Sequence, residues 1–241
     1  MPRPISFLPL DQSDLKIAVQ SALAAVLCLG LPTGLYFWLI TLQRLSPSPG
    51  IDRLVDFFSN YLVPPMLLGR LGAIAWGFLL SKISGYRQWW WPALASMAGF
   101  WLGDFALYHG WLPDWVRALS PRGLSPPVHF GITLAMTALS VTVCTGVLLG
   151  FTLLSWKASL MLAINTGSAA TLAAVVTLII LDRFGIRVGS GNAAMPKATA
   201  VATMAAALAG GVVLGVVFSR YARTGSSDQH VISDQTSATG G

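Results

Sequence analysis

Six long apolar segments constrain this chain more than any other feature of its sequence. They lie at about 16–42, 65–84, 89–110, 129–155, 158–181 and 197–219, and none has a long polar interruption. A hydrocarbon core about 30 Å thick is crossed by about 20 helical residues, so each segment is long enough to span it. The sequence therefore predicts an all-α integral membrane protein, a bundle of about six transmembrane helices.

Composition supports the lipid bilayer as the main partner of this chain. Of its 241 residues, 54% are hydrophobic and only 10% are charged, whereas about 25% are charged in a typical soluble domain. The net charge is +6, but the Lys and Arg residues stand singly at the ends of the apolar segments. Such charges set topology and contact lipid headgroups, so we expect no nucleic-acid partner.

The predicted organisation has three parts. Residues 1–15 form an N-terminal segment, 16–223 form the six-span transmembrane domain, and 224–241 form a polar tail. The tail is rich in Ser, Thr, Gly, Asp and Gln, so it is predicted to be disordered.

The links between the segments differ in length. Tight turns are predicted at 85–88 and 156–157, and the links at 43–64 and 111–128 are long. Both long links lie on one side of the membrane, and each is expected to hold a short interfacial helix. The first such helix is predicted at 51–62, where apolar and polar residues alternate with helical spacing.

The second interfacial helix is expected around Trp111 and Trp115, and the residues 89–91, all Trp, predict an aromatic belt on the opposite side. In the first span, Pro32 between Gly30 and Gly34 predicts a kink, because proline removes a backbone donor and clashes with the preceding turn.

Charge alone does not orient the bundle, since seven basic residues lie on each side of the predicted membrane. The two tight basic turns favour the cytoplasmic side. We therefore expect a multi-pass protein of the cell membrane with both termini in the cytoplasm.

Small residues recur at a spacing of four along several spans, which predicts close helix packing. The predicted contact residues are Gly99 and Gly103, Gly146 and Gly150, and Ala207, Gly211 and Gly215. Packing inside one bundle is the favoured interpretation, and a face for a second copy is the alternative.

Three polar residues are predicted at membrane depth, where they are costly: Arg70, Asp104 and Asn165. Counted outward from Tyr86, Arg70 and Asp104 fall within about 3 Å of the same depth, so we expect them to form an ion pair. Asn165, Thr166 and Ser168 could line a solute path or could hold neighbouring helices together, and the second interpretation is favoured.

No catalytic or metal site is predicted. His109 and His129 lie near span ends and His230 lies in the tail, so the spans hold no histidine cluster. Ser168 lacks a Gly-x-Ser-x-Gly context and a deep base, and Cys28 and Cys144 stand alone. An enzyme is disfavoured, and the residues point to no cofactor.

Three stretches, at 15–25, 37–43 and 69–77, look like the opening of fusaric-acid and aromatic-acid exporters. The resemblance covers about the first third of the chain and implies export. The stretch between Trp38 and Arg70 is longer than that family's pattern, the later spans depart from it, and the family's soluble domain has no room here. The export function is accordingly not adopted.

Two functions suit this sequence. A small-solute transporter or permease component fits six spans with a few polar residues at membrane depth. The alternative is a non-catalytic structural subunit, for which the small-residue stripes would hold other membrane subunits or a second copy of this chain.

Overall fold

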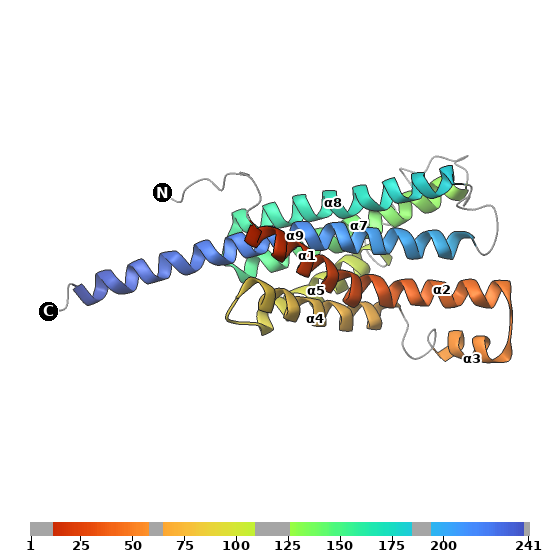
Figure 1. The fold of residues 1–241 in the computed structure, drawn as a ribbon, viewed down its shortest axis with the longest axis horizontal. Coiled ribbons are helices and arrows are strands. Elements are labelled where there is room, and N and C mark those ends of the chain that lie inside the picture. The colour runs from red at the N-terminus through yellow and green to blue at the C-terminus, as the bar shows by residue number, and fades with distance from the viewer. Residues whose placement is uncertain (1–11, 58–64, 109–125, 185–193, 239–241) are drawn as a thin grey trace.

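Helices make up this computed structural model, which describes residues 12–57, 65–108, 126–184 and 194–238; no strand occurs among them. The prediction of an all-α fold is confirmed for this part of the chain. A helix occupies each of the six predicted apolar segments. Figure 1 shows these helices side by side in an elongated bundle, with α9 continuing past the others at one end.

Four helical segments of the described residues are long and apolar enough to cross a membrane: Gln12–Gly30, Ile132–Thr152, Trp156–Arg183 and Lys197–Arg223. The predicted count of six spans is therefore not confirmed. Helices α4 (Pro65–Ser84) and α5 (Trp90–Tyr108) have 20 and 19 residues.

The first helical rod is interrupted by a wider turn. It consists of α1 (Gln12–Ala25), the π-helical turn η1 (Val26–Gly30) and α2 (Leu31–Leu45), in which the Leu31 N–H donates to the Val26 carbonyl. Pro32 follows at once and has no N–H to donate, so the wide turn absorbs the disruption. Figure 1 shows the axis changing direction here, where the sequence predicts a kink.

A short helix, α3 (Pro49–Phe57), lies in the first long link and overlaps the helix predicted at 51–62. Ser48 caps its start, because the Ser48 hydroxyl accepts the Ile51 N–H at 3.3 Å. Residues 58–64 and the second predicted interfacial helix, around Trp111 and Trp115, lie outside the described residues.

Two tight turns join helices at one end of the bundle. After α4, Gly85 adopts a positive φ of 72°, and the Tyr86 N–H donates to the Ser81 carbonyl at 2.9 Å. This pattern ends a helix without leaving its last carbonyls unpaired. The tryptophans predicted as an aromatic belt, residues 89–91, follow this turn and are exposed.

The other tight turn lies between α7 (Pro126–Thr152) and α8 (Trp156–Arg183), at 153–155 rather than at the predicted 156–157. The boundary moves because the Ser155 hydroxyl accepts the Ala158 N–H at 3.2 Å and so caps α8 one residue before Trp156.

The last helix, α9 (Ala194–Ala238), continues through most of the tail that composition predicts to be disordered. Its end projects beyond the other helices in Figure 1. Extending a helix costs much less than starting one, and no proline stops α9 after Arg223, so the helix can run on past the bundle.

The helices pack in the spatial order α4, α5, α7, α8, α9, α1, and contacts between α1 and α4 close the ring. The starts of α1 and α8 and the two tight turns lie at one end, which we call the packed end. The starts of α7 and α9 lie at the other, which we call the hollow end (Figure 1).

Candidate functional site

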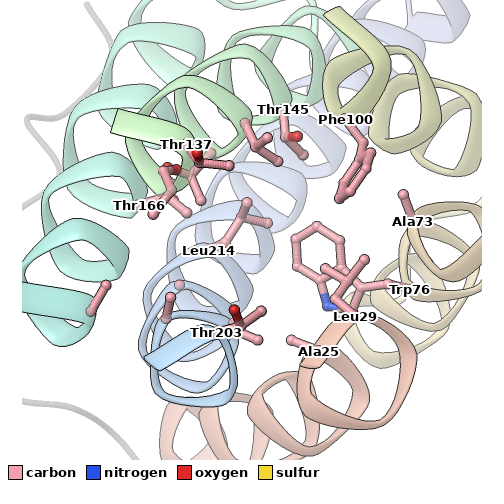
Figure 2. A pocket seen from close by; sticks show the side chains of 18 of the residues that line it. Ala25, Leu29, Ala73, Trp76, Phe100, Thr137, Thr145, Thr166, Thr203 and Leu214 are labelled. Carbon is pink, nitrogen blue, oxygen red and sulfur yellow. The ribbon is translucent and has the colours of Figure 1, made fainter. Parts of the chain in front are cut away.

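A cavity of about 300 Å³ lies inside the bundle, among residues of α1, η1, α4, α5, α7, α8 and α9. On α7 its lining runs from Thr133 to Thr145, which at 1.5 Å per residue is about 18 Å along the bundle axis. Figure 2 shows Trp76 and Phe100 reaching into the space between the facing helices. The cavity thus extends from the middle of the bundle toward the hollow end.

Short side chains create this space. The wall contributed by α9 consists largely of these residues: Thr199, Ala202, Thr203, Ala206, Ala207 and Gly210. Helices lined by such residues can approach closely at some points and still leave a void between the points of contact. An empty void forfeits dispersion contacts, so a filled cavity is the more stable state.

The cavity has a closed floor toward the packed end. Trp76 and Leu214 line it, and both also belong to the main cluster of buried apolar side chains. Below them, Leu80, Leu149 and Phe218 are fully buried. Because no lining residue lies beyond this cluster, the cavity stops at the middle of the bundle.

A hydrogen bond and an aromatic contact hold the packed end together. The Tyr86 hydroxyl donates to the Thr152 carbonyl at 2.6 Å, and the Tyr86 ring packs edge-on against Phe218 at 5.7 Å between centroids. Burial raises the pKa of Tyr86, so its hydroxyl stays protonated and able to donate. The first tight turn is thereby tied to the second.

Three buried polar groups line the cavity without a hydrogen-bond partner in the described part of the chain. They are the indole N–H of Trp76 and the hydroxyls of Ser96 and Thr166, whose residues are 4%, 0% and 2% exposed. Leaving such a group unpaired costs about 1–3 kcal/mol. These groups are therefore ready to bind a molecule that enters the cavity.

Other hydroxyls of the lining already donate hydrogen bonds to backbone carbonyls of their own helix. Thr137 donates to the Thr133 carbonyl at 2.8 Å, and Thr142 donates to the Ala138 carbonyl at 2.6 Å. Threonine bonded in this way presents its methyl group and a remaining acceptor oxygen. The wall of α7 is thus only weakly polar.

Charge is missing from the described lining of the cavity, which includes no Asp, Glu, Lys, Arg or His. The described residues also hold no group of His, Cys, Asp or Glu that could bind a metal ion. A charged guest would lose its hydration here and find no counter-charge, which is strongly unfavourable. The geometry therefore suits uncharged molecules.

The predicted pair of Arg70 and Asp104 lies on adjacent helices, α4 and α5. Gly69 faces the ring of Phe100 across the same interface, and because the two helices are antiparallel this puts Asp104 about 7.5 Å from Arg70 along the axis. An arginine side chain can reach that far. The side chain of Asp104 lies outside the described part, so the ion pair stays a prediction.

The three polar residues predicted together on α8 are separated by the structure. Thr166 is buried and lines the cavity, whereas Ser168 is exposed and Asn165 is partly exposed on the outer face. The Asn165 amide donates to the Met161 carbonyl at 2.8 Å, within its own helix. Of the three, only Thr166 is placed to contact a molecule in the cavity.

Each of the small residues predicted at helix contacts faces another helix of this chain. The pairs are Gly99 and Gly103 of α5 against α7, Gly146 and Gly150 of α7 against α8, and Ala207, Gly211 and Gly215 of α9 against α1 and η1. An added Cβ at Gly150 would collide with the backbone of Ser159. The stripe on α9 is thus covered by the same chain.

Trp76 and Ser96 line the cavity but were not predicted to do so, because neither stands in a recognisable sequence motif. A weak signal did exist on α7, where Thr133, Thr137 and Thr145 share one helical face. Threonines repeated at multiples of four in an apolar span mark a face with both hydroxyl and methyl groups.

A charged cluster joins the first and last helices at the packed end. Asp14 is 7% exposed in its side chain and accepts hydrogen bonds from Arg220 at 2.7 Å and from Arg223 at 2.6 Å. Arg223 also donates to the Ser219 carbonyl at 3.3 Å. Asp14 and these arginines are about 200 residues apart in sequence, so no local pattern predicts that they pair.

Comparison with known protein families, with curated proteins and with solved structures gave no match for this chain.

Proposed function

We propose that this chain is a six-span protein of the cell membrane that carries a small uncharged solute, as a transporter or permease component. The observation that carries the proposal is the one-sided cavity. It begins at the floor of Trp76 and Leu214 and extends toward the hollow end. A path closed at one end and hollow toward the other suits a carrier with access from one side.

The six-span count rests on α4 and α5 as further spans beside the four apolar helices. Both have spanning length and pack between α1 and α7 in the ring. With both termini in the cytoplasm, the hollow end faces away from the cytoplasm. A reporter fused at Gly241 tests the orientation, and activity of that reporter only outside the cell would contradict it.

Transport can be measured by light scattering of proteoliposomes after an osmotic step. The solutes form a series of uncharged molecules with growing apolar bodies: glycerol, 1,2-butanediol and 1,2-hexanediol. We expect faster re-swelling than in protein-free vesicles, with the gain confined to those solutes that fit a mostly apolar cavity.

A matched pair of variants connects the rate to the cavity. Ala206→Phe places a ring in the cavity, whereas Val201→Phe places the same ring on the exposed face of α9. The first variant should remove the gain in rate and the second should preserve it. Equal rates with and without protein for every solute would overturn the transport proposal.

A structural subunit of a larger membrane complex is the second candidate. Ser168 is exposed and Asn165 partly exposed on the outer face of α8, in the middle of an apolar span. Polar groups facing lipid at that depth are stabilised when a neighbouring helix bonds to them. This observation favours a partner helix beside α8.

Purification in a mild detergent tests the second candidate. A subunit should leave the membrane with partners at a fixed ratio, and the double change Asn165→Leu with Ser168→Ala should release them. Leu172→Ile, on the same exposed face, is the control that should leave the ratio unchanged. A chain that purifies alone in both forms contradicts the subunit function.

A further inference from the structure

We infer that the cavity binds an uncharged single-chain amphiphile, whose oxygen atom accepts a hydrogen bond from the indole N–H of Trp76. This inference rests on the proposed function, since it names the class of molecule that the same cavity holds. Trp76 lies on α4 at the floor of the cavity and is visible at the centre of the gap in Figure 2.

The chemistry of the indole sets the first requirement on this molecule. Trp76 Nε1–H can only donate, and it has no hydrogen-bond partner in the described residues although its side chain is almost fully buried. A guest must therefore supply an acceptor atom. A hydroxyl, ether or carbonyl oxygen meets this need without adding charge.

Two further hydroxyls of the lining strengthen the requirement for an oxygen-bearing molecule. Ser96 on α5 and Thr166 on α8 line the same cavity and are likewise unpaired within the described part. A hydroxyl can donate or accept, so an alcohol can pair with any one of these groups. A hydrocarbon without oxygen would leave all three groups unpaired.

The rest of the lining determines the shape and polarity of the alkyl chain that the bound molecule carries. From Thr145 toward Thr133 the wall of α7 offers methyl groups and aliphatic side chains over about 18 Å. The space of about 300 Å³ is thus elongated and mostly apolar. A single alkyl chain fits it better than a compact polyol does.

The absence of charge from the described lining excludes an ionised head. A carboxylate would accept the indole hydrogen bond but would be desolvated with no cation in the lining. An ammonium group could not accept from Trp76 at all. Amphiphiles of equal chain length should therefore differ in affinity according to their head groups.

Three ten-carbon probes test the inference with purified full-length protein in nanodiscs: 1-decanol, decane and decanoate at pH 8. Affinity is measured by the rise in unfolding temperature at equal mole fractions of probe in the lipid. One neutral hydrogen bond is worth about 1 kcal/mol, so decanol should bind about fivefold more tightly than decane. Decanoate should bind more weakly than decanol.

Substitutions assign the preference to the proposed donor. Trp76→Phe keeps an aromatic ring but removes the N–H, and the decanol preference over decane should fall to the smaller part that the remaining hydroxyls supply. Thr166→Val and Thr171→Val form a matched pair on α8. Both hydroxyls are buried and unpaired within the described residues, but only Thr166 lines the cavity. Only Thr166→Val should reduce decanol binding.

The outcomes separate the inference from the proposed function. If decanol and decane bind equally to the unaltered protein, or if Trp76→Phe keeps the preference undiminished, the inference is overturned even when diol transport persists. If the preference depends on Trp76 but no diol is transported, the transport proposal falls and the binding site stands.

Discussion

The packed end and the hollow end are built from the same helices but from different side chains. At the packed end, large residues such as Leu80, Leu149 and Phe218 fill the space between helices and are fully buried. At the hollow end, Thr, Ala and Gly line a cavity of about 300 Å³. Large side chains fill the packed end, whereas short side chains leave space toward the hollow end.

The residues that stabilise the fold are also separated in space from the residues proposed to bind a ligand. The packed end has the Asp14 cluster, the Tyr86 bond to Thr152 and the main apolar cluster. It can hold the helices in register while the hollow end leaves polar groups unpaired. A binding site retains such local cost because a rigid region elsewhere stabilises the fold.

The largest expected effect is the difference in stability loss between a leucine-to-alanine change at the packed end and one beside the cavity. Leu162→Ala at the packed end removes a fully buried side chain and should lower the free energy of unfolding by about 2–5 kcal/mol. Leu134→Ala beside the cavity should cost about 1 kcal/mol, because Leu134 is only partly buried and already borders a void. Thermal unfolding in detergent micelles measures both, and equal losses would contradict the comparison.

Charge reversal tests the predicted ion pair of Arg70 on α4 with Asp104 on α5. Arg70→Asp or Asp104→Arg alone should destabilise the protein by about 3 kcal/mol, as expected for an unpaired charge at membrane depth. The double exchange should restore most of this loss if the two side chains meet. Single variants that are both tolerated, with no gain in the double variant, would rule out the pair. The yield of monodisperse protein in detergent reports the result.

Glycine substitutions test how closely the helices approach. Gly150→Ala brings a Cβ against the Ser159 backbone and should cost about 1–3 kcal/mol. Gly210→Ala is the control, because its added Cβ would lie 3.5 Å from the nearest atom, the Cβ of Ala170, which is ordinary contact. Unfolding temperatures of the two variants should therefore differ, and identical values would argue against close packing at Gly150.

The charged cluster at the packed end should contribute less, because Arg223 is about half exposed. Asp14→Asn should lower the free energy of unfolding by about 1–2 kcal/mol, and the loss should shrink at high salt. Asp182→Asn, at an exposed site on α8, is the control and should have no measurable effect. Unfolding at two salt concentrations gives the comparison.

The smallest effect is expected for the end of α9. Deleting residues 224–241 should change the free energy of unfolding by less than about 0.5 kcal/mol, because this part projects beyond the bundle in Figure 1. Its amides should exchange with solvent much faster than those near Phe218. Slow exchange in the tail would indicate that something covers it.

Much of the fold followed from the sequence alone. Apolar length placed a helix in every predicted segment, and Pro32 predicted a kink in the first rod, where the structure has a wide turn at Val26–Gly30. These features depend on neighbours in the chain, through hydrogen bonding and hydrophobic periodicity. Composition predicted disorder for 224–241, because composition alone does not show that a helix begun earlier in the chain can continue into a polar stretch.

Only the tertiary structure decided which polar residues share a site. Asn165, Thr166 and Ser168 are adjacent in sequence, yet only Thr166 faces the cavity, because the rotation of α8 is fixed by Gly146 and Gly150 packing against it. Trp76 and Ser96 join Thr166 from other helices. The sequence by itself determined the helices and their apolar character, whereas their packing created the cavity, since a void depends on side-chain volumes from helices far apart in the chain.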